Sequence, residues 1–201
     1  MAQYLRQSNK FKEFFQLLSG HPMGFAGLAI IIFFLIMEIF APFLGTVDRA
    51  ASGEVENLLL PPSSQFWFGT DDLARDICSQ TIYGSRISLT IGFVAALITV
   101  FSGTLVGLVA GYYGKILDEA LMRIVDFFMM LPELPLMIVL AAVLGPSMWN
   151  IILVVSLVSW PTTARVVRSQ VLSLKERPFV ESSRCIGASN FQLMFSEILP
   201  N

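Results

Sequence analysis

The residues of this chain that could do chemistry are two carboxylates set in a long apolar stretch. Asp126 and Glu133 stand seven residues apart, so a single helix would carry both on one face. A carboxylate inside a membrane is costly and usually faces a partner or a cavity. We expect Asp126 to pair with Arg123, three residues earlier. Glu133 lies between Pro132 and Pro135, where a kinked helix would suit a translocation path or gate; a protonated, hydrogen-bonded Glu133 is the equal alternative.

The sequence shows no group of residues that would support enzyme chemistry or metal binding. His21 is the single histidine, which excludes a zinc site of the HExxH type. Cys78 and Cys185 lie on opposite sides of the membrane in the topology derived below, so we interpret each as a small filler residue and expect no disulfide. The sequence holds no G-x-x-x-x-G-K-[ST] phosphate-binding loop. We therefore predict no catalytic residue, no metal site and no cofactor in this chain.

The last residues of the chain form the second candidate site. Apolar and small side chains recur there every three or four positions, at Phe179, Val180, Ser183, Ile186, Phe191, Met194, Phe195 and Ile198. Gly187 permits the positive-φ turn that ends one short helix, and Ser189 or Asn190 can cap the next. This helix pair would present Glu181 and Arg184 beside apolar side chains. It could fit a groove on a partner protein or lie on the inner leaflet, and the spacing leaves both open.

The elements that must position these residues are membrane helices. Hydrophobic residues make up 55% of the chain and charged residues 14%, against about 25% charged in soluble domains. The net charge of −2 gives no reason to expect nucleic-acid binding. The first apolar run is too long for a signal peptide and is interpreted as an uncleaved anchor. About 20 residues cross a bilayer, and the four stretches of that length are Gly24–Leu44, Ile87–Gly111, Ile124–Leu144 and Met148–Val167.

The distribution of basic residues predicts the orientation of these spans. The segment before the first span and residues 165–201 are rich in lysine and arginine, whereas residues 45–85 hold two basic residues against six acidic ones. Basic loops stay in the cytoplasm, so both ends of the chain are predicted to be cytoplasmic in a multi-pass protein of the cell membrane. We divide the chain into residues 1–85 (tail, first span, external loop) and residues 86–201 (transmembrane domain).

Two further features concern packing. Gly103, Gly107 and Gly111 form a stripe that lets another helix approach closely, from this chain or from a second subunit. In the external loop, Asp71–Tyr83 has helical spacing and is expected to form a short amphipathic helix on the outer surface. The first twenty residues would form a cytoplasmic interfacial helix or a frayed tail.

Two motifs resemble those of a known family. The pattern Glu181, Gly187-Ala188 and Leu199-Pro200 resembles the EAA motif of binding-protein-dependent ABC-importer permeases, with Ser182-Ser183 in place of its usual Ala-Ala. The outer segments 68–77 and 82–89 resemble the G-T-D-x-x-G-R-D…Y-G-A-R-x-S-L signature of the dipeptide/oligopeptide/nickel permeases, C-type subunit. Ala74 stands where glycine is usual and Gln80 where arginine is usual. Segments 111–114, 123–126 and 131–132 match as well.

The resemblance implies an all-α membrane bundle of six transmembrane helices, of which this chain would hold four and be truncated at its C-terminal end. It implies import of di- or oligopeptides by alternating access. The partners would be a second permease subunit, two ATP-binding subunits that hold the ATP, and an extracytoplasmic solute-binding protein. The alternatives are nickel or another small solute as the substrate, or a membrane scaffold subunit with no transport role.

The resemblance also assigns roles to residues. Segment 176–201 would be the coupling loop that docks on the ATPase, through Glu181, Arg184, Gly187, Ala188, Leu199 and Pro200. The signature residues of the external loop are Gly69, Thr70, Asp71, Arg75 and Asp76. From the spans we add Glu133, Asp126 and Pro132 as candidates for the pathway or gate.

Overall fold

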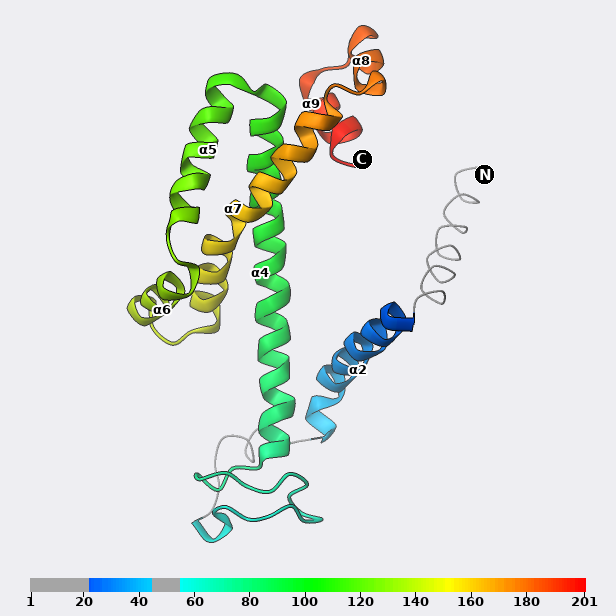
Figure 1. The fold of residues 1–201 in the computed structure, drawn as a ribbon. Coiled ribbons are helices and arrows are strands. Elements are labelled where there is room, and N and C mark those ends of the chain that lie inside the picture. Colours follow the sequence, from blue (N-terminus) through cyan, green and yellow to red (C-terminus); the bar gives the residue numbers. More distant parts are fainter. Residues whose placement is uncertain (1–21, 45–54) are drawn as a thin grey trace. The chain divides into compact units, whose positions relative to one another are not determined.

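The computed structural model describes residues 22–44 and 55–201, and every regular element in these ranges is helical (Figure 1). The predicted all-α membrane class is confirmed. The expected interfacial helix of the first twenty residues lies outside the described residues. The elements are α2 (Pro22–Leu44), η1 (Val55–Asn57), α4 (Ile77–Tyr113), α5 (Lys115–Met130), α6 (Glu133–Leu144), α7 (Met148–Leu174), α8 (Pro178–Cys185), α9 (Asn190–Gln192) and η2 (Leu193–Ile198).

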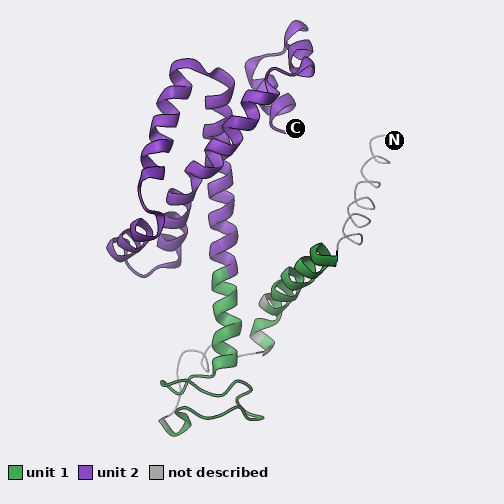
Figure 2. Ribbon diagram, viewed as in Figure 1, with its two compact units in different colours: residues 1–88 green, residues 89–201 purple. Residues whose placement is uncertain are grey.

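The chain forms two compact units, residues 1–88 and residues 89–201, with the boundary inside α4 (Figure 2). In the described ranges α2, α4 and α7 are each long and apolar enough to cross a membrane. Helices α5 and α6 pass the same test only as a pair, and they are bent by 85° at the break between them. The described residues therefore supply three candidate spans, or up to four if the bent pair counts as one.

The break between α5 and α6 is sharper than the kink predicted there. Leu131 has an extended backbone (φ −81°, ψ 135°) because the ring of Pro132 disfavours a helical residue before it. Pro135 lies in the first turn of α6, where a missing N–H removes no helical hydrogen bond. Asp126 and Glu133 were expected on one helical face, but the break places them on two different helices.

The predicted helix Asp71–Tyr83 is wrong in its first half. Residues 71–76 form turns, and the helix begins at Ile77 and continues into the rest of α4. Ala74 has a left-handed backbone (φ 58°), which no α-helix accommodates. Asp76 then starts α4, since its carboxylate accepts hydrogen bonds from the Cys78 N–H (3.2 Å) and the Ser79 hydroxyl (2.6 Å).

In the second unit, α7 crosses α4 along the predicted glycine stripe (Figure 1). A Cβ atom on Gly103 would lie 2.6 Å from Cβ of Thr163, and one on Gly107 would lie 2.4 Å from the carbonyl oxygen of Ala164. A Cβ on Gly111 would lie 2.8 Å from Cβ of Val171. The close neighbour that the sequence left open is therefore α7 of the same chain.

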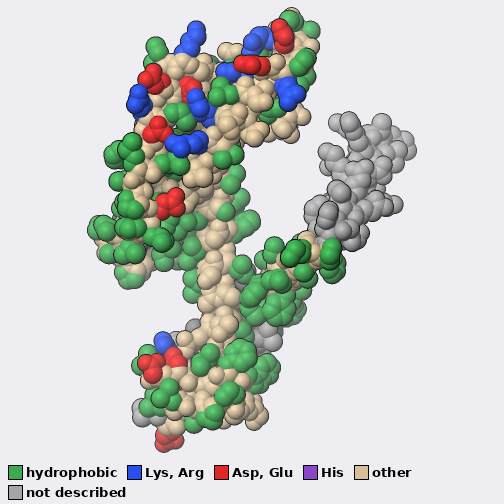
Figure 3. Space-filling view, viewed as in Figure 1, with side chains coloured by type: hydrophobic (Ala, Val, Ile, Leu, Met, Phe, Trp, Pro, Cys, Tyr) green, Lys and Arg blue, Asp and Glu red, His purple; other side chains and the backbone are tan. Residues whose placement is uncertain are grey.

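The core of the second unit joins the tail (residues 176–201) to the ends of α4 and α7. The buried side chains that form it are Leu108, Val171, Val180, Leu193, Met194 and Ile198. Charged side chains of this unit gather mostly at the same end, over the start of α5, the end of α7 and α8 (Figure 3). Apolar side chains cover most of α6 and the far half of α5 in that view.

Candidate functional site

The tail begins with α8, whose ends are fixed by local rules. Pro178 occupies the first helical position, where its missing N–H costs nothing. At the other end Gly187 has φ +92°. Its N–H donates to the Arg184 carbonyl (3.1 Å), and the Ala188 N–H donates to the Ser183 carbonyl (3.1 Å). These two bonds form a Schellman turn, so the positive-φ turn predicted at Gly187 is confirmed.

The next helical segment starts with the cap predicted from sequence. The Gln192 N–H donates to Oγ of Ser189 (3.3 Å), and the Ser189 N–H donates to Oε1 of Gln192 (2.9 Å), which completes a capping box. The hydroxyl of Tyr112, at the end of α4, donates to Oδ1 of Asn190 (2.7 Å). The turn between α8 and α9 is thereby tied to the bundle.

The tail has two faces with opposite chemistry. Val180, Leu193 and Ile198 are buried against α4 and α7 and hold the tail in place. Glu181 and Arg184 lie on the exposed face and make no ion pair within the described part of the chain. Ile186 stands beside them with 87% of its surface exposed. The outer face thus offers two opposite charges next to the uncovered Ile186, and Phe191 (66% exposed) is a further uncovered apolar side chain of the tail.

The structure corrects two expectations for this segment. Val180, Met194 and Ile198 were among the apolar side chains expected to be presented outward, but they face the bundle. Cys185 was interpreted as a filler, yet it is exposed, and both cysteines are free. Ala188 packs against the tail core, whereas Leu199 and Pro200 are exposed near the end of the chain.

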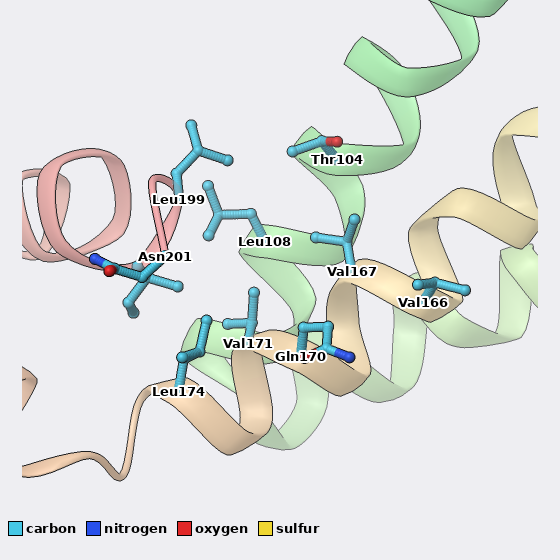
Figure 4. A pocket seen from close by; sticks show the side chains of 10 residues that line it. Thr104, Leu108, Val166, Val167, Gln170, Val171, Leu174, Leu199 and Asn201 are labelled. Carbon is cyan, nitrogen blue, oxygen red and sulfur yellow. The ribbon is translucent and has the colours of Figure 1, made fainter. Parts of the chain in front are cut away.

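A hollow of about 380 Å³ lies where the end of the tail meets α4 and α7 (Figure 4). Its lining has no charged side chain and is contributed by Thr104, Leu108, Val166, Val167, Gln170, Val171, Leu174, Ile198, Leu199 and Asn201. This chemistry suits an apolar side chain of a neighbouring segment rather than an ion.

The carboxylates of α5 find their partners on α7. Asp126 pairs with Arg165, not with Arg123 as predicted, and Arg123 pairs instead with Glu119 on its own helix (3.4 Å). The prediction failed because it weighed only neighbours within one helix. Arg165 is 39 residues away from Asp126, a distance that helical spacing does not register.

A second ion pair between these helices was missed altogether. Arg168 binds Asp118 with two nitrogens, and its Nη2 lies 2.7 Å from Oδ2. Only 14% of the Asp118 side chain and 31% of the Arg168 side chain are exposed. A signal was present, since Arg165 and Arg168 stand three residues apart on one face of an otherwise uncharged helix.

Glu133 is the first residue of α6 and is exposed, with Pro132 just before it. A carboxylate in the first turn of a helix is favoured by the helix dipole. Glu133 therefore has a local structural role at the start of α6. Its role in a translocation pathway remains a prediction.

The five signature residues of the loop 55–76 share one hydrogen-bonded network. Gly69 has φ +76°, and a Cβ there would lie 2.4 Å from the Leu60 carbonyl oxygen. Thr70 accepts the Leu60 N–H (2.8 Å) and donates to the Asn57 carbonyl. Asp71 accepts the Arg75 N–H and side-chain Nε, each at 2.8 Å. Asp76 starts α4 as described above.

Gln80, which stands where arginine is usual, also binds Asp71, through Nε2 at 2.8 Å from Oδ2. Burial on its own would raise the pKa of Asp71, but hydrogen bonds from Gln80, Arg75 and Leu73 outweigh it and hold the pKa well below its usual value. The carboxylate therefore stays charged and keeps the turn 71–75 closed.

Comparison with known proteins covers most of the chain. Residues 103–201 match the family described as binding-protein-dependent transport system inner membrane component, and residues 9–62 match the N-terminal TM domain of oligopeptide transport permease C. The dipeptide transport system permease protein of Alkalihalophilus pseudofirmus is 40% identical over 95% of this chain and 62% of its own length. The oligopeptide transport system permease protein of Bacillus subtilis is 38% identical, over 90% and 59%.

The glutathione transport system permease protein of Escherichia coli is 39% identical over 94% of this chain and 62% of its own length. The chain thus spans about three fifths of the length of these curated relatives.

Proposed function

Because this chain belongs to the family of binding-protein-dependent transport system inner membrane components, we propose that it is a permease subunit of an ATP-driven importer whose substrates are di- or oligopeptides. The printed names of the similar proteins refer to dipeptides, oligopeptides and glutathione, which favours a peptide over nickel. The chain is not an enzyme in this proposal, and ATP is hydrolysed by partner subunits.

The observation that carries the proposal is the two-faced tail. One face is anchored in the core through Val180, Leu193 and Ile198. The other leaves Glu181, Arg184 and Ile186 uncovered at the end of α8 and the Gly187 turn. An anchored helix that ends in an uncovered apolar side chain next to two charges fits a groove on a partner protein. We assign that groove to a cytoplasmic ATP-binding subunit, with a second permease subunit and an extracytoplasmic binding protein completing the transporter.

The orientation follows from the same assignment. Docking on a cytoplasmic ATPase requires the tail to be cytoplasmic, in agreement with the basic residues that gather at that end of the second unit. The loop 55–76 is then extracytoplasmic, on the side from which a binding protein delivers the substrate. ATP binding moves the tail, and the helices that hold it rock to expose the substrate path alternately to each side.

The deciding experiment replaces Gly187 by valine in the assembled transporter. Apart from its two chain neighbours, no described residue has an atom within 4 Å of a Cβ built on Gly187, so the damage comes from the backbone at φ +92° rather than from a clash. We expect substrate-stimulated ATP hydrolysis to fall by at least about tenfold, while the protein stays in the membrane. The matched control is Gly92→Val, at a helical glycine of α4 that also has open space around it.

Cys185 provides an independent reading of docking, because it is an exposed thiol two residues before Gly187. In a Cys78→Ser background, a membrane-impermeant maleimide should label Cys185 only from the cytoplasmic side, and a bound ATP-binding subunit should protect it. Full stimulated activity in Gly187→Val would refute the coupling role. Failure of the wild-type protein to co-purify with any ATP-binding subunit would favour the scaffold alternative.

A further inference from the structure

Two arginines on the second half of α7 and a lysine just beyond its end fasten it to neighbouring helices. Arg168 holds Asp118 of α5 with two nitrogens, and Arg165 holds Asp126 of the same helix. Lys175, one residue beyond α7, donates from Nζ to the Gly111 carbonyl near the end of α4 (2.9 Å). The rings of Trp160 and Phe128 then meet edge to face, with centroids 5.7 Å apart.

The tail belongs to the same fastened group. Only three residues separate the end of α7 at Leu174 from the start of α8 at Pro178, and the Arg177 N–H donates back to the Leu174 carbonyl (3.0 Å). Val180 of α8 shares a core with Val171 of α7. A displacement of α8 is therefore passed directly to the second half of α7.

Helical hydrogen bonding is interrupted just beyond the fastened group, on both helices that leave it, although α7 remains one continuous helix. The pair α5–α6 breaks at Leu131–Pro132 with an 85° bend. Helix α7 contains Pro161, which removes one backbone hydrogen bond from its middle. The Phe128–Trp160 contact places these two interruptions beside each other. Beyond these two interruptions, Asn150 of α7 donates to the Leu144 carbonyl of α6 (2.6 Å). Helix α6 is thereby bonded to the first half of α7.

We propose that the ion pairs Arg168–Asp118 and Arg165–Asp126 clamp α5 to the second half of α7, so that both move with the tail as one body about a joint formed by Leu131–Pro132 and Pro161. This proposal rests on the proposed transport function and adds the residues that transmit the movement. Arg168 and Asp118 are positioning residues in this scheme. A two-nitrogen arginine–carboxylate contact fixes both distance and orientation, and partial burial shields it from solvent, as a clamp requires.

The test compares clamp variants with a matched ion pair that cannot clamp. Arg168→Gln and Asp118→Asn each remove the pair, and the swap of Arg168→Asp with Asp118→Arg restores opposite charges. Arg123→Gln is the control, because its pair with Glu119 lies within α5 and joins no second helix. We expect each single clamp variant to lower substrate-stimulated ATP hydrolysis and transport by about tenfold. The swap should recover a large part of that loss, and the control should stay near wild type.

Two thiol probes separate transmission from mere folding. Native Cys185 reports docking of the tail, and Met130→Cys reports the joint, since Met130 is 81% exposed at the end of α5. Cys185 is read in a Cys78→Ser background and position 130 in a Cys78→Ser, Cys185→Ser background, each with and without ATP. In the wild-type transporter both labelling rates should respond to ATP. In Arg168→Gln the response at Cys185 should persist, while the response at position 130 should be lost.

Several outcomes overturn the clamp. Stimulated hydrolysis within about twofold of wild type in the single variants would do so, as would a normal ATP response at position 130 in Arg168→Gln. If a single variant fails to reach the membrane, the half-exposed pair is tested through Arg165→Gln with the same two probes. Failure of the proposed function looks different, because the wild-type protein itself would then show no ATP response at Cys185.

Discussion

The loop 55–76 and the tail both carry a family signature, but the two signatures are used in opposite ways. In the loop, Gly69 packs closely against the Leu60 backbone, and the side chains of Thr70 and Asp71 accept hydrogen bonds from other residues of the same loop. In the tail, the side chains of Glu181 and Arg184 are exposed and make no ion pair in the described residues. A signature can therefore encode the shape of a segment or the surface it offers, and only the contacts distinguish the two.

Among variants that distinguish the loop 55–76 from the tail, we expect Gly69→Ala to have the largest effect on stability. A Cβ there would clash with the Leu60 carbonyl oxygen and would sit at φ +76°, so the loop should lose about 3 kcal/mol of local stability. Hydrogen exchange of the Thr70 and Ile77 amides, which bond across the loop, measures this loss. Gly84→Ala, with open space around it, is the control. Unchanged protection of both amides would contradict the structural role of this signature.

A smaller effect is expected at the outward face of the tail. Ile186→Asp should weaken docking of the ATP-binding subunit by about 2 kcal/mol, because an exposed apolar anchor becomes charged. Its melting temperature should stay at the wild-type value, since Ile186 packs on nothing that holds the fold. The matched control is Ile116→Asp, at an isoleucine of α5 with similar exposure. An equal loss of docking in both variants would contradict the claim that the tail forms the docking surface for the ATP-binding subunit.

The smallest effect should be a gain in stability. Ala74 occupies a left-handed position (φ 58°) where the family pattern has glycine. Ala74→Gly relieves that strain but adds chain entropy to the unfolded state and removes a buried methyl, which leaves a net gain of about 0.5 kcal/mol. The measurement is the same amide exchange of the loop, and slower exchange is the expected sign. Faster exchange would show that the methyl matters more than the backbone.

The parts of the structure that sequence predicted are those determined by neighbours in the chain. Apolar runs located the spans, and Gly187 and Ser189 marked the end of one helix and the start of the next. Each of these features depends on a few consecutive residues. The sequence also placed a kink at Pro132, although the angle of the break depends on what both helices pack against.

The parts that sequence missed depend on which helices meet. The glycine stripe indicated a close neighbour without identifying α7, and Asp126 was paired within its own helix although Arg165 approaches from α7. In the tail, the periodic apolar residues predicted helices but not which of them would be buried. Val180 is covered by α4 and α7, whereas Ile186 falls beyond the bundle. Tertiary packing decides which of these side chains are buried and which are exposed. The spacing of residues along the chain does not carry that information.

The length of α4 has a consequence for how the chain sits in a bilayer. Its 37 residues extend over about 55 Å, whereas the apolar core of a bilayer is only about 30 Å thick. A tilt takes up part of the excess, and in the proposed topology the polar first turns, with Gln80 and Thr81, project beyond the apolar core. In the proposed topology, the Asp76 cap and the Lys175 bond to Gly111 then hold the two ends of α4 to polar segments outside the apolar core. Lipid thickness would adjust to this helix rather than set its position.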